Sequence, residues 1–144
     1  MLLGLDPLLS PDLLHALAAM GHGDRIVLVD RNYPATRGRR LIHLPGIDTP
    51  RALQAVLSVL PIDTFVAEPC AVMQIVGTLS TLPPVVVEMN ALLARHGVGP
   101  AASLERHAFY ETAETAYAIV QTGERRLYGN ILLTKGVVPP EDRA

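Results

Sequence analysis

Short aliphatic runs alternate with longer helical patterns along this chain of 144 residues, and 12 prolines and 11 glycines separate them. Ile26 to Val29 is one such run; it is too short for a helix and rich in the branched side chains typical of a buried strand. Strands that alternate with helices of about 10–15 residues indicate an α/β fold. We therefore predict a single domain over residues 1–144, with a mixed, largely parallel sheet flanked by helices and a C-terminal tail at residues 136–144.

Capping residues and prolines predict where the helices begin. Ser10-Pro11-Asp12 supplies an N-cap, a proline at the first helical position and an acid in the first turn. Thr49-Pro50 repeats the arrangement with Thr49 as the cap, and a third helix is expected after Pro84. A fourth helix is predicted from Tyr110 to Thr122, because apolar residues recur there at helical spacing and Gly123 follows.

Further β-branched or alternating stretches predict the remaining strands. In one of them, Phe65 is expected to point into the core. The stretch from Ala71 to Leu82 is compatible with more than one type of structure. The predicted strands are Leu41–Leu44, Thr64–Val66, Ala102–His107 and Tyr128–Leu133.

Charge and hydropathy exclude several classes of protein. The chain has 14 acidic and 12 basic residues and is 49% apolar, which excludes a disordered chain and argues against a nucleic-acid binder. The mean hydropathy of +0.30 suggests apolar surface buried in a homo-oligomer, yet no run reaches the roughly 18 apolar residues of a membrane span. The single cysteine, Cys70, and the lack of a basic leader segment favour the cytoplasm. No zinc spacing, phosphate loop or dinucleotide fingerprint occurs, so neither a metal nor a cofactor is expected.

Three residues at junctions of helices and strands are candidates for chemistry. His22 lies between Gly21 and Gly23, where an exposed imidazole could donate or accept a proton, although a helix cap followed by a solvated histidine explains it as well. Asp30 ends a predicted strand, where ligands of α/β proteins bind. Asp63 occupies a similar position, and both aspartates could instead be turn residues.

A second group of candidates lies near the end of the chain. Tyr128 and Asn130 would face the same side of the predicted strand and offer a phenol and an amide, a pair suited to neutral polyols. An edge strand with polar residues facing water is the alternative. Arg106 could bind hydroxyl groups and Tyr110 could act as a weak acid or a donor, or both could be ordinary surface and packing residues.

Taken together, these segments resemble the L-fucose mutarotase and D-ribose pyranase family, over nearly the whole chain. The Phe-Tyr pair and the Tyr-Gly-Asn triplet are closer to the L-fucose branch, whereas Tyr33 stands where phenylalanine is common and His107 sits at a variable position. The segments that carry the resemblance are Leu8–Pro11, Met20–Asp24, Asp30–Ala35, Pro61–Thr64, Phe109–Tyr110, Thr122–Glu124 and Leu127–Asn130.

The resemblance implies an isomerase that interconverts the α and β anomers of L-fucose or a related monosaccharide, without a cofactor. It implies a closed homo-oligomeric ring, commonly a decamer, with sites near subunit boundaries. His22 and Tyr110 are expected to be catalytic, and the expected substrate-binding residues are Asp30, Asp63, Arg106, Tyr128 and Asn130. A D-ribose pyranase, a non-catalytic sugar-binding module and a purely structural ring subunit are the alternatives.

Overall fold

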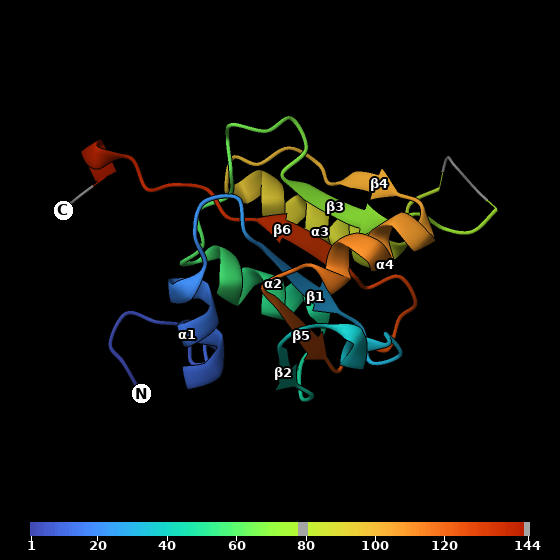
Figure 1. Ribbon diagram of the computed structural model, residues 1–144, viewed down its shortest axis with the longest axis horizontal. Helices are drawn as coiled ribbons and strands as arrows, with labels where there is room; N and C mark the ends of the chain where they lie inside the picture. Colours follow the sequence, from blue (N-terminus) through green and yellow to red (C-terminus); the bar gives the residue numbers. More distant parts are fainter. Residues whose placement is uncertain (78–80, 143–144) are drawn as a thin grey trace.

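The computed structural model, which describes residues 1–77 and 81–142, is built on a six-stranded sheet in the order β2-β5-β1-β6-β3-β4 (Figure 1). All neighbouring strands pair in parallel except at β6, which is antiparallel to both β1 and β3. Five strands therefore run in one direction, and the prediction of an α/β domain with a largely parallel sheet is confirmed. The strands are β1 (Arg25–Val29), β2 (Leu41–Leu44), β3 (Cys70–Met73), β4 (Ala102–Leu104), β5 (Ala118–Thr122) and β6 (Ile131–Thr134).

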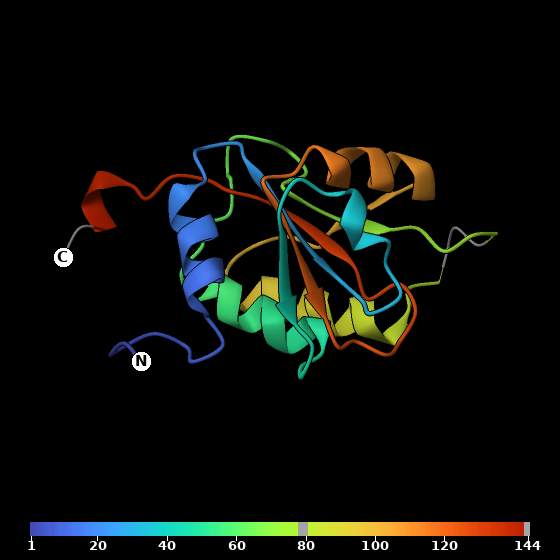
Figure 2. The same ribbon diagram turned by 60° about the horizontal axis from the view of Figure 1, so that its bottom comes forward.

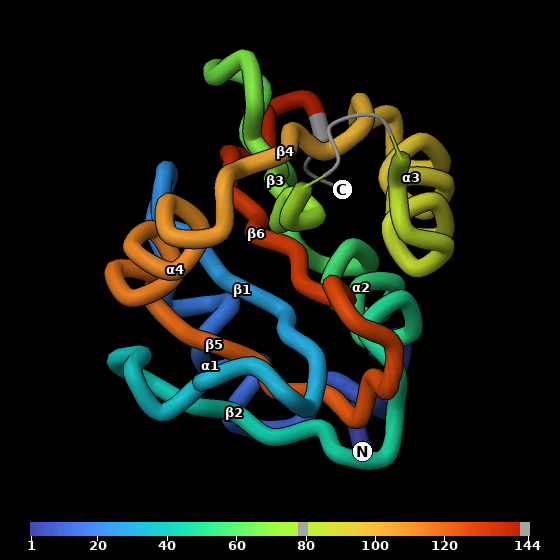
Figure 3. The backbone as a smooth tube through the Cα atoms, turned by 90° about the vertical axis from the view of Figure 1, so that its right-hand side faces the viewer, coloured from blue at the N-terminus to red at the C-terminus, as the bar shows by residue number. Residues whose placement is uncertain are grey.

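Helices cover both faces of the sheet, so that the domain has three layers (Figures 2 and 3). Side chains of β1 alternate between two hydrophobic clusters: Ile26 and Leu28 pack on one face, and Val27 and Val29 on the other. One cluster packs beneath α1 (Pro11–Ala19), α2 (Thr49–Leu57) and α3 (Pro84–Arg95). The other packs beneath α4 (Arg106–Glu114) and the short 3₁₀ helix η1 (Ala35–Arg37); a second 3₁₀ helix, η2 (Pro140–Asp142), lies near the C-terminus.

The first three helices are confirmed, with one change at a cap. Ser10 caps α1 as predicted, because its side chain accepts a hydrogen bond from the N–H of Leu13. The cap of α2 is Asp48 rather than Thr49, since the Asp48 carboxylate accepts from the N–H of Arg51. Thr49 is instead buried at the first helical position. Within the described part of the chain, no helix is both long enough and apolar enough to cross a membrane.

The predicted helix from Tyr110 to Thr122 is wrong. Its first part belongs to α4, which begins at Arg106 and ends at Glu114, and its second part is β5, a strand between β2 and β1. Ala118, Ile119 and Val120 are all buried because both faces of this strand are covered. A strand buried on both faces has a continuous apolar run instead of an alternating one, and such a run also fits helical spacing.

The other strand predictions need smaller corrections. No strand forms at residues 64–66, where the Asp63 carboxylate accepts from the N–H of Phe65 in a tight turn, and Phe65 is 73% exposed instead of pointing inward. The predicted strand at 102–107 stops at Leu104, and that at 128–133 begins only at Ile131. The stretch 71–82 contributes to β3 and then to a loop, although residues 78–80 lie outside the described residues.

Candidate functional site

An open pocket of about 210 Å³ lies at the edge of the sheet where the five co-directional strands end. Its walls come from the segment after β1, the end of β3, the first turns of α4 and the turn that precedes β6. This is the edge at which open α/β sheets bind ligands. The pocket is lined by Asp30, Asn32, Tyr33, Met73, Arg106, Tyr110, Leu127, Tyr128 and Asn130.

Five of the seven predicted site residues meet in this pocket, although they come from distant parts of the sequence. They are Asp30, Arg106, Tyr110, Tyr128 and Asn130. Asn32, Met73 and Leu127 also line the pocket but were not predicted as site residues. The available signal for Asn32 was its position three residues after the end of β1 and two after Asp30.

Asp30 and Asn130 form the buried floor of the pocket, each 4% exposed. The Asp30 N–H donates to the Asn130 side-chain oxygen over 2.8 Å, so the Asn130 NH₂ group remains as a donor. One Asp30 carboxylate oxygen accepts from the N–H of Asn32 over 2.9 Å. Burial raises the pKa of Asp30, against the opposing effect of this N–H and of Asn130. The floor therefore offers a carboxylate that can accept, and an amide that can donate, hydrogen bonds to hydroxyl groups.

Three tyrosines form the aromatic part of the pocket. The rings of Tyr33 and Tyr110 lie 5.4 Å apart, centroid to centroid, and burial raises the pKa of Tyr33 well above the usual tyrosine range. Tyr128 has a φ of +64°, a conformation that is unfavourable by roughly 1–2 kcal/mol for a residue with a side chain. Its hydroxyl accepts a hydrogen bond from the N–H of Val76 over 3.3 Å. The Tyr33 phenol therefore remains protonated at neutral pH, and the hydroxyl group of a tyrosine can donate a hydrogen bond to a ligand.

The other two predicted site residues, His22 and Asp63, form a pair of their own. Nε2 of His22 lies 3.1 Å from a carboxylate oxygen of Asp63, and the imidazole is 46% exposed while the carboxylate is almost fully buried. The N–H of Phe65 and, after it, the His22 side chain hold the pKa of Asp63 below its usual value. The Phe65 ring lies 5.4 Å from the imidazole ring. Asp63 thus fixes one nitrogen of His22 and leaves Nδ1 toward solvent or a ligand.

This pair and the pocket lie at opposite ends of β1. His22 precedes β1, and the N–H of Asp63 donates to Thr134 at the far end of β6, which pairs with Arg25 at the start of β1. Asp30 follows the last residue of β1, a strand of five residues that spans roughly 17 Å. One monosaccharide cannot contact His22 and Asp30 within the same chain.

The arrangement defines a class of protein: a single-domain α/β protein with a polar, tyrosine-lined pocket at the carboxyl edge of its sheet. A family model described as the RbsD / FucU transport protein family matches residues 3–138. The chain belongs to this family.

Individual relatives resemble this chain over nearly their whole length. A protein named fucose mutarotase from Bos taurus is 45% identical, with 96% of this chain and 95% of that protein covered. An L-fucose mutarotase from Actinobacillus pleuropneumoniae is 43% identical, with coverage of 96% and 99%. The solved structure of the fucose mutarotase from Streptococcus pneumoniae in complex with L-fucose has a TM-score of 0.90 and 39% identity, and covers 96% of this chain and all of that one.

Proposed function

We propose that this protein is a mutarotase, an isomerase that interconverts the α and β anomers of L-fucose. The observation that carries the proposal is the pocket, in which a carboxylate, an amide, a guanidinium and phenols surround a space of about 210 Å³. Such donors and acceptors match the hydroxyl groups of a neutral monosaccharide. Relatives named fucose mutarotase at more than 40% identity support L-fucose as the substrate.

Mutarotation requires only proton transfers and one reversible bond cleavage. The ring oxygen gains a proton and the anomeric hydroxyl loses one while the bond between C1 and the ring oxygen breaks. The former hydroxyl oxygen becomes the aldehyde oxygen of the open chain. Rotation about the C1–C2 bond and the reverse steps then close the ring on the other face of the aldehyde. The reaction needs an acid and a base in position, and each such group typically contributes about 10²–10⁴-fold.

We assign the acid to His22 and the proton transfer at the anomeric hydroxyl to Tyr110. The hydrogen bond between Nε2 of His22 and Asp63 leaves Nδ1 as the nitrogen that exchanges a proton with the ring oxygen. Asp63 then serves the reaction by holding the imidazole, in addition to the binding role that the resemblance implies. Tyr110 acts on the anomeric hydroxyl directly or through a water molecule, and the pocket residues Asp30, Arg106, Tyr128 and Asn130 bind the remaining hydroxyls.

We infer that the protein works as a ring of identical subunits, in which His22 of one chain reaches the pocket of the next. The separation of His22 from Asp30 by the length of β1 supports this, because His22 and Asp30 of one chain cannot both contact the same sugar. Several large apolar side chains are exposed on the isolated chain, including Phe65 beside His22 and Leu127 in the pocket wall. Contacts between subunits would cover such surface. A decamer is the expected ring size.

We place the protein in the cytoplasm on the basis of its cysteine. Cys70 is 2% exposed within β3 and unpaired, and burial raises the pKa of its thiol to about 12. An unpaired, unreactive cysteine suits a reducing compartment. Fractionation of cells that produce the tagged protein tests this location, and recovery outside the cytoplasmic fraction would contradict it.

Saturation-transfer NMR tests the proposed activity. Irradiation of the α-anomer signal of L-fucose is expected to reduce the β-anomer signal more strongly when the protein is added, because the protein accelerates exchange. An exchange rate unchanged by the wild-type protein would rule out the enzyme. Sugar binding without faster exchange would indicate a binding module, and no sugar-induced rise in melting temperature would indicate a structural subunit. Faster exchange between the pyranose and furanose forms of D-ribose than between fucose anomers would instead identify a ribose pyranase.

A further inference from the structure

The turn that carries Tyr128 into the pocket is stabilised by residues that do not themselves line the pocket. Tyr128 adopts a φ of +64°, which is disfavoured for tyrosine and persists only when the surroundings enforce it. The segment from Glu124 to Asn130 forms no strand or helix. Contacts to other elements must therefore keep this turn in shape.

Glu124 is the buried anchor of the segment, with a side chain only 3% exposed. Its carboxylate accepts hydrogen bonds from the N–H and the Nε of Arg126, both over 2.9 Å, and from a terminal nitrogen of the same guanidinium over 3.0 Å. Its carbonyl oxygen accepts from the N–H of Arg31, just beyond Asp30. Burial would raise the pKa of Glu124, but the hydrogen bonds from Arg126 outweigh it and hold the pKa below its usual value. The carboxylate therefore stays charged at neutral pH.

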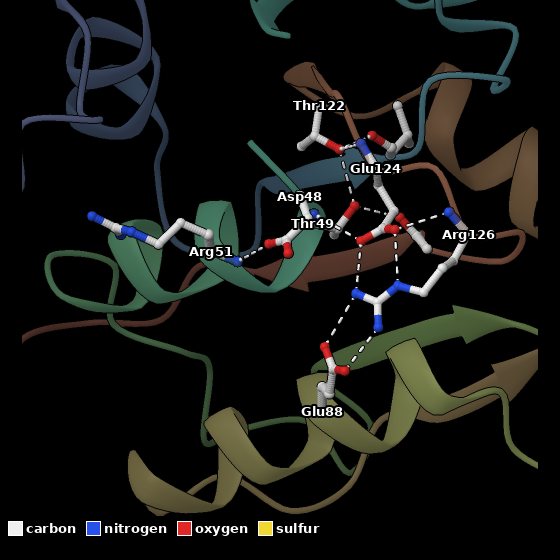
Figure 4. Close-up of polar contacts among 9 residues, drawn as sticks. Asp48, Thr49, Arg51, Glu88, Thr122, Glu124 and Arg126 are labelled. Atoms are coloured by element: carbon white, nitrogen blue, oxygen red, sulfur yellow. Dashed lines mark hydrogen bonds and ion pairs between the residues drawn. The ribbon is translucent and has the colours of Figure 1, made fainter. Parts of the chain in front are cut away.

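Thr49 at the start of α2 holds the other side of the turn (Figure 4). Its hydroxyl donates to the carbonyl of Gly129 over 2.7 Å, and its N–H lies 3.3 Å from the Glu124 carboxylate. Gly129 packs so closely on Glu124 that a Cβ would lie 2.5 Å from the Glu124 Cγ. Thr122 completes the cluster, because its hydroxyl accepts from the N–H of Glu124 and donates to the carbonyl of Val29 at the end of β1. The turn is thereby joined to α2, β5 and β1.

We propose that Glu124 and Thr49 are positioning residues, which hold the turn in the conformation that directs Tyr128 and Asn130 at the substrate. Neither lines the pocket, so they act only through the residues that do. The assignment of a sugar as the ligand rests on the proposed function, whereas the coupling between Thr49, Glu124 and the turn rests on the contacts above.

Glu88, the exposed partner of Arg126, is not expected to position the turn. Figure 4 shows the guanidinium between Glu124 and Glu88 of α3, with Arg126–Glu88 distances of 2.8 and 3.1 Å. The Glu88 side chain is 51% exposed, and exposed ion pairs contribute little. The two glutamates therefore provide a matched comparison of a buried and an exposed partner of one arginine.

Substitutions at Thr49 test the proposal. Thr49→Val removes the hydroxyl and keeps the shape, Thr49→Ser restores the hydroxyl, and Ser58→Ala removes a hydroxyl that donates to a backbone carbonyl at the other end of α2. We expect Thr49→Val to weaken L-fucose binding about three- to tenfold, the effect of about one hydrogen bond, and to raise KM more than it lowers the exchange rate at saturation. Thr49→Ser and Ser58→Ala are expected to resemble the wild type.

A measurement without sugar tests the conformation of the turn independently of the proposed activity. The chain has four tyrosines, so labelling with 3-fluorotyrosine gives four ¹⁹F signals, and Tyr128→Phe identifies that of Tyr128. We expect Thr49→Val to shift this signal and Thr49→Ser to restore it. A folded Thr49→Val protein with an unchanged Tyr128 signal overturns the proposal, whether or not the wild type binds fucose. A wild type that neither binds fucose nor accelerates its exchange overturns the proposed function and leaves the ¹⁹F result to decide the role of Thr49.

A second pair of variants applies if Thr49→Val does not fold. Arg126→Gln removes the guanidinium from both glutamates, whereas Glu88→Gln removes only the charge of the exposed partner and leaves the guanidinium bonds to Glu124 in place. We expect the Tyr128 signal and the sugar affinity to change in Arg126→Gln and to remain near wild type in Glu88→Gln. Equal behaviour of the two variants would contradict a role for Glu124.

Discussion

His22 is the residue whose loss should stop the reaction while leaving the floor of the pocket intact. Asp30 and Asn130 bond to each other and not to His22, so His22→Ala is expected to lower the exchange rate of L-fucose about 10²–10⁴-fold with a much smaller change in affinity. Saturation-transfer NMR measures the rate, and His96→Ala, at the exposed end of α3, is the control. Exchange at the wild-type rate in His22→Ala would remove the assignment of the acid.

Asp30 is expected to make sugar binding dependent on pH. The ionised carboxylate accepts hydroxyl hydrogen bonds more strongly than the protonated form. Because burial raises its pKa, protonation on acidification begins at a higher pH than for an ordinary aspartate, and affinity for L-fucose is expected to fall as the pH drops through that raised value. Calorimetric titration over a pH series, with folding monitored, measures this fall. Asp30→Asn should bind more weakly and lack the dependence; the same pH profile in both proteins would exclude Asp30 as its source.

Among the elements, β5 depends on an unusually close contact at its end. Gly123 donates its N–H to the carbonyl of Ile47, and a Cβ at Gly123 would lie 2.1 Å from the carbonyl oxygen of Pro45. Backbone atoms cannot move aside as a flexible side chain does, so Gly123→Ala is expected to destabilise the fold by about 1–3 kcal/mol. Thermal unfolding measures the loss, and Gly46→Ala, with no atom near the added Cβ, is the control. Equal melting temperatures of Gly123→Ala and Gly46→Ala would contradict the close approach of Gly123 to Pro45.

Helix starts could be predicted from the sequence, whereas one central strand could not. Ser10 and the prolines at the starts of helices predicted α1, α2 and α3, because a cap and a fixed φ act over one turn of chain. The strand β5 was missed because burial on both faces removes the alternation that distinguishes a strand from a helix. Tyr128 and Asn130 were correctly grouped, but the reason was wrong: they belong to a turn with a positive φ and not to one face of a strand.

For the whole molecule, the position of His22 leads to a test with mixed subunits. If each site takes His22 from one chain and the pocket from its neighbour, His22→Ala and Asp30→Asn, each impaired alone, should regain activity when they are unfolded and refolded together at a sugar concentration that does not saturate Asp30→Asn. Random mixing would make about a quarter of the sites intact across such a head-to-tail interface. The exchange rate of the mixture measures this recovery, and each variant refolded alone is the control. No recovery in mixed rings would contradict the shared site.

Native mass spectrometry tests the size of the assembly. A decamer is expected to appear at ten times the 15.5 kDa mass of one chain. Exposed apolar side chains such as Phe65 are the surface that subunit contacts would bury, so Phe65→Asp is expected to shift the assembly toward smaller species. A wild-type protein that is monomeric at micromolar concentration would exclude the ring.

The sequence by itself determined the class of fold, the starts of three helices and the types of residue in the candidate site. These follow from local preferences: apolar spacing, capping side chains and prolines act on neighbouring residues whatever the rest of the chain does. Tertiary structure decided which candidates share a site. Asp30 and Asn130 are 100 residues apart and meet only because β6 lies antiparallel to β1. The same pairing brings Thr134, and with it Asp63, to the start of β1, where His22 lies. Strand order depends on which long-range contacts bury the most apolar surface together, and no stretch of neighbouring residues carries that information.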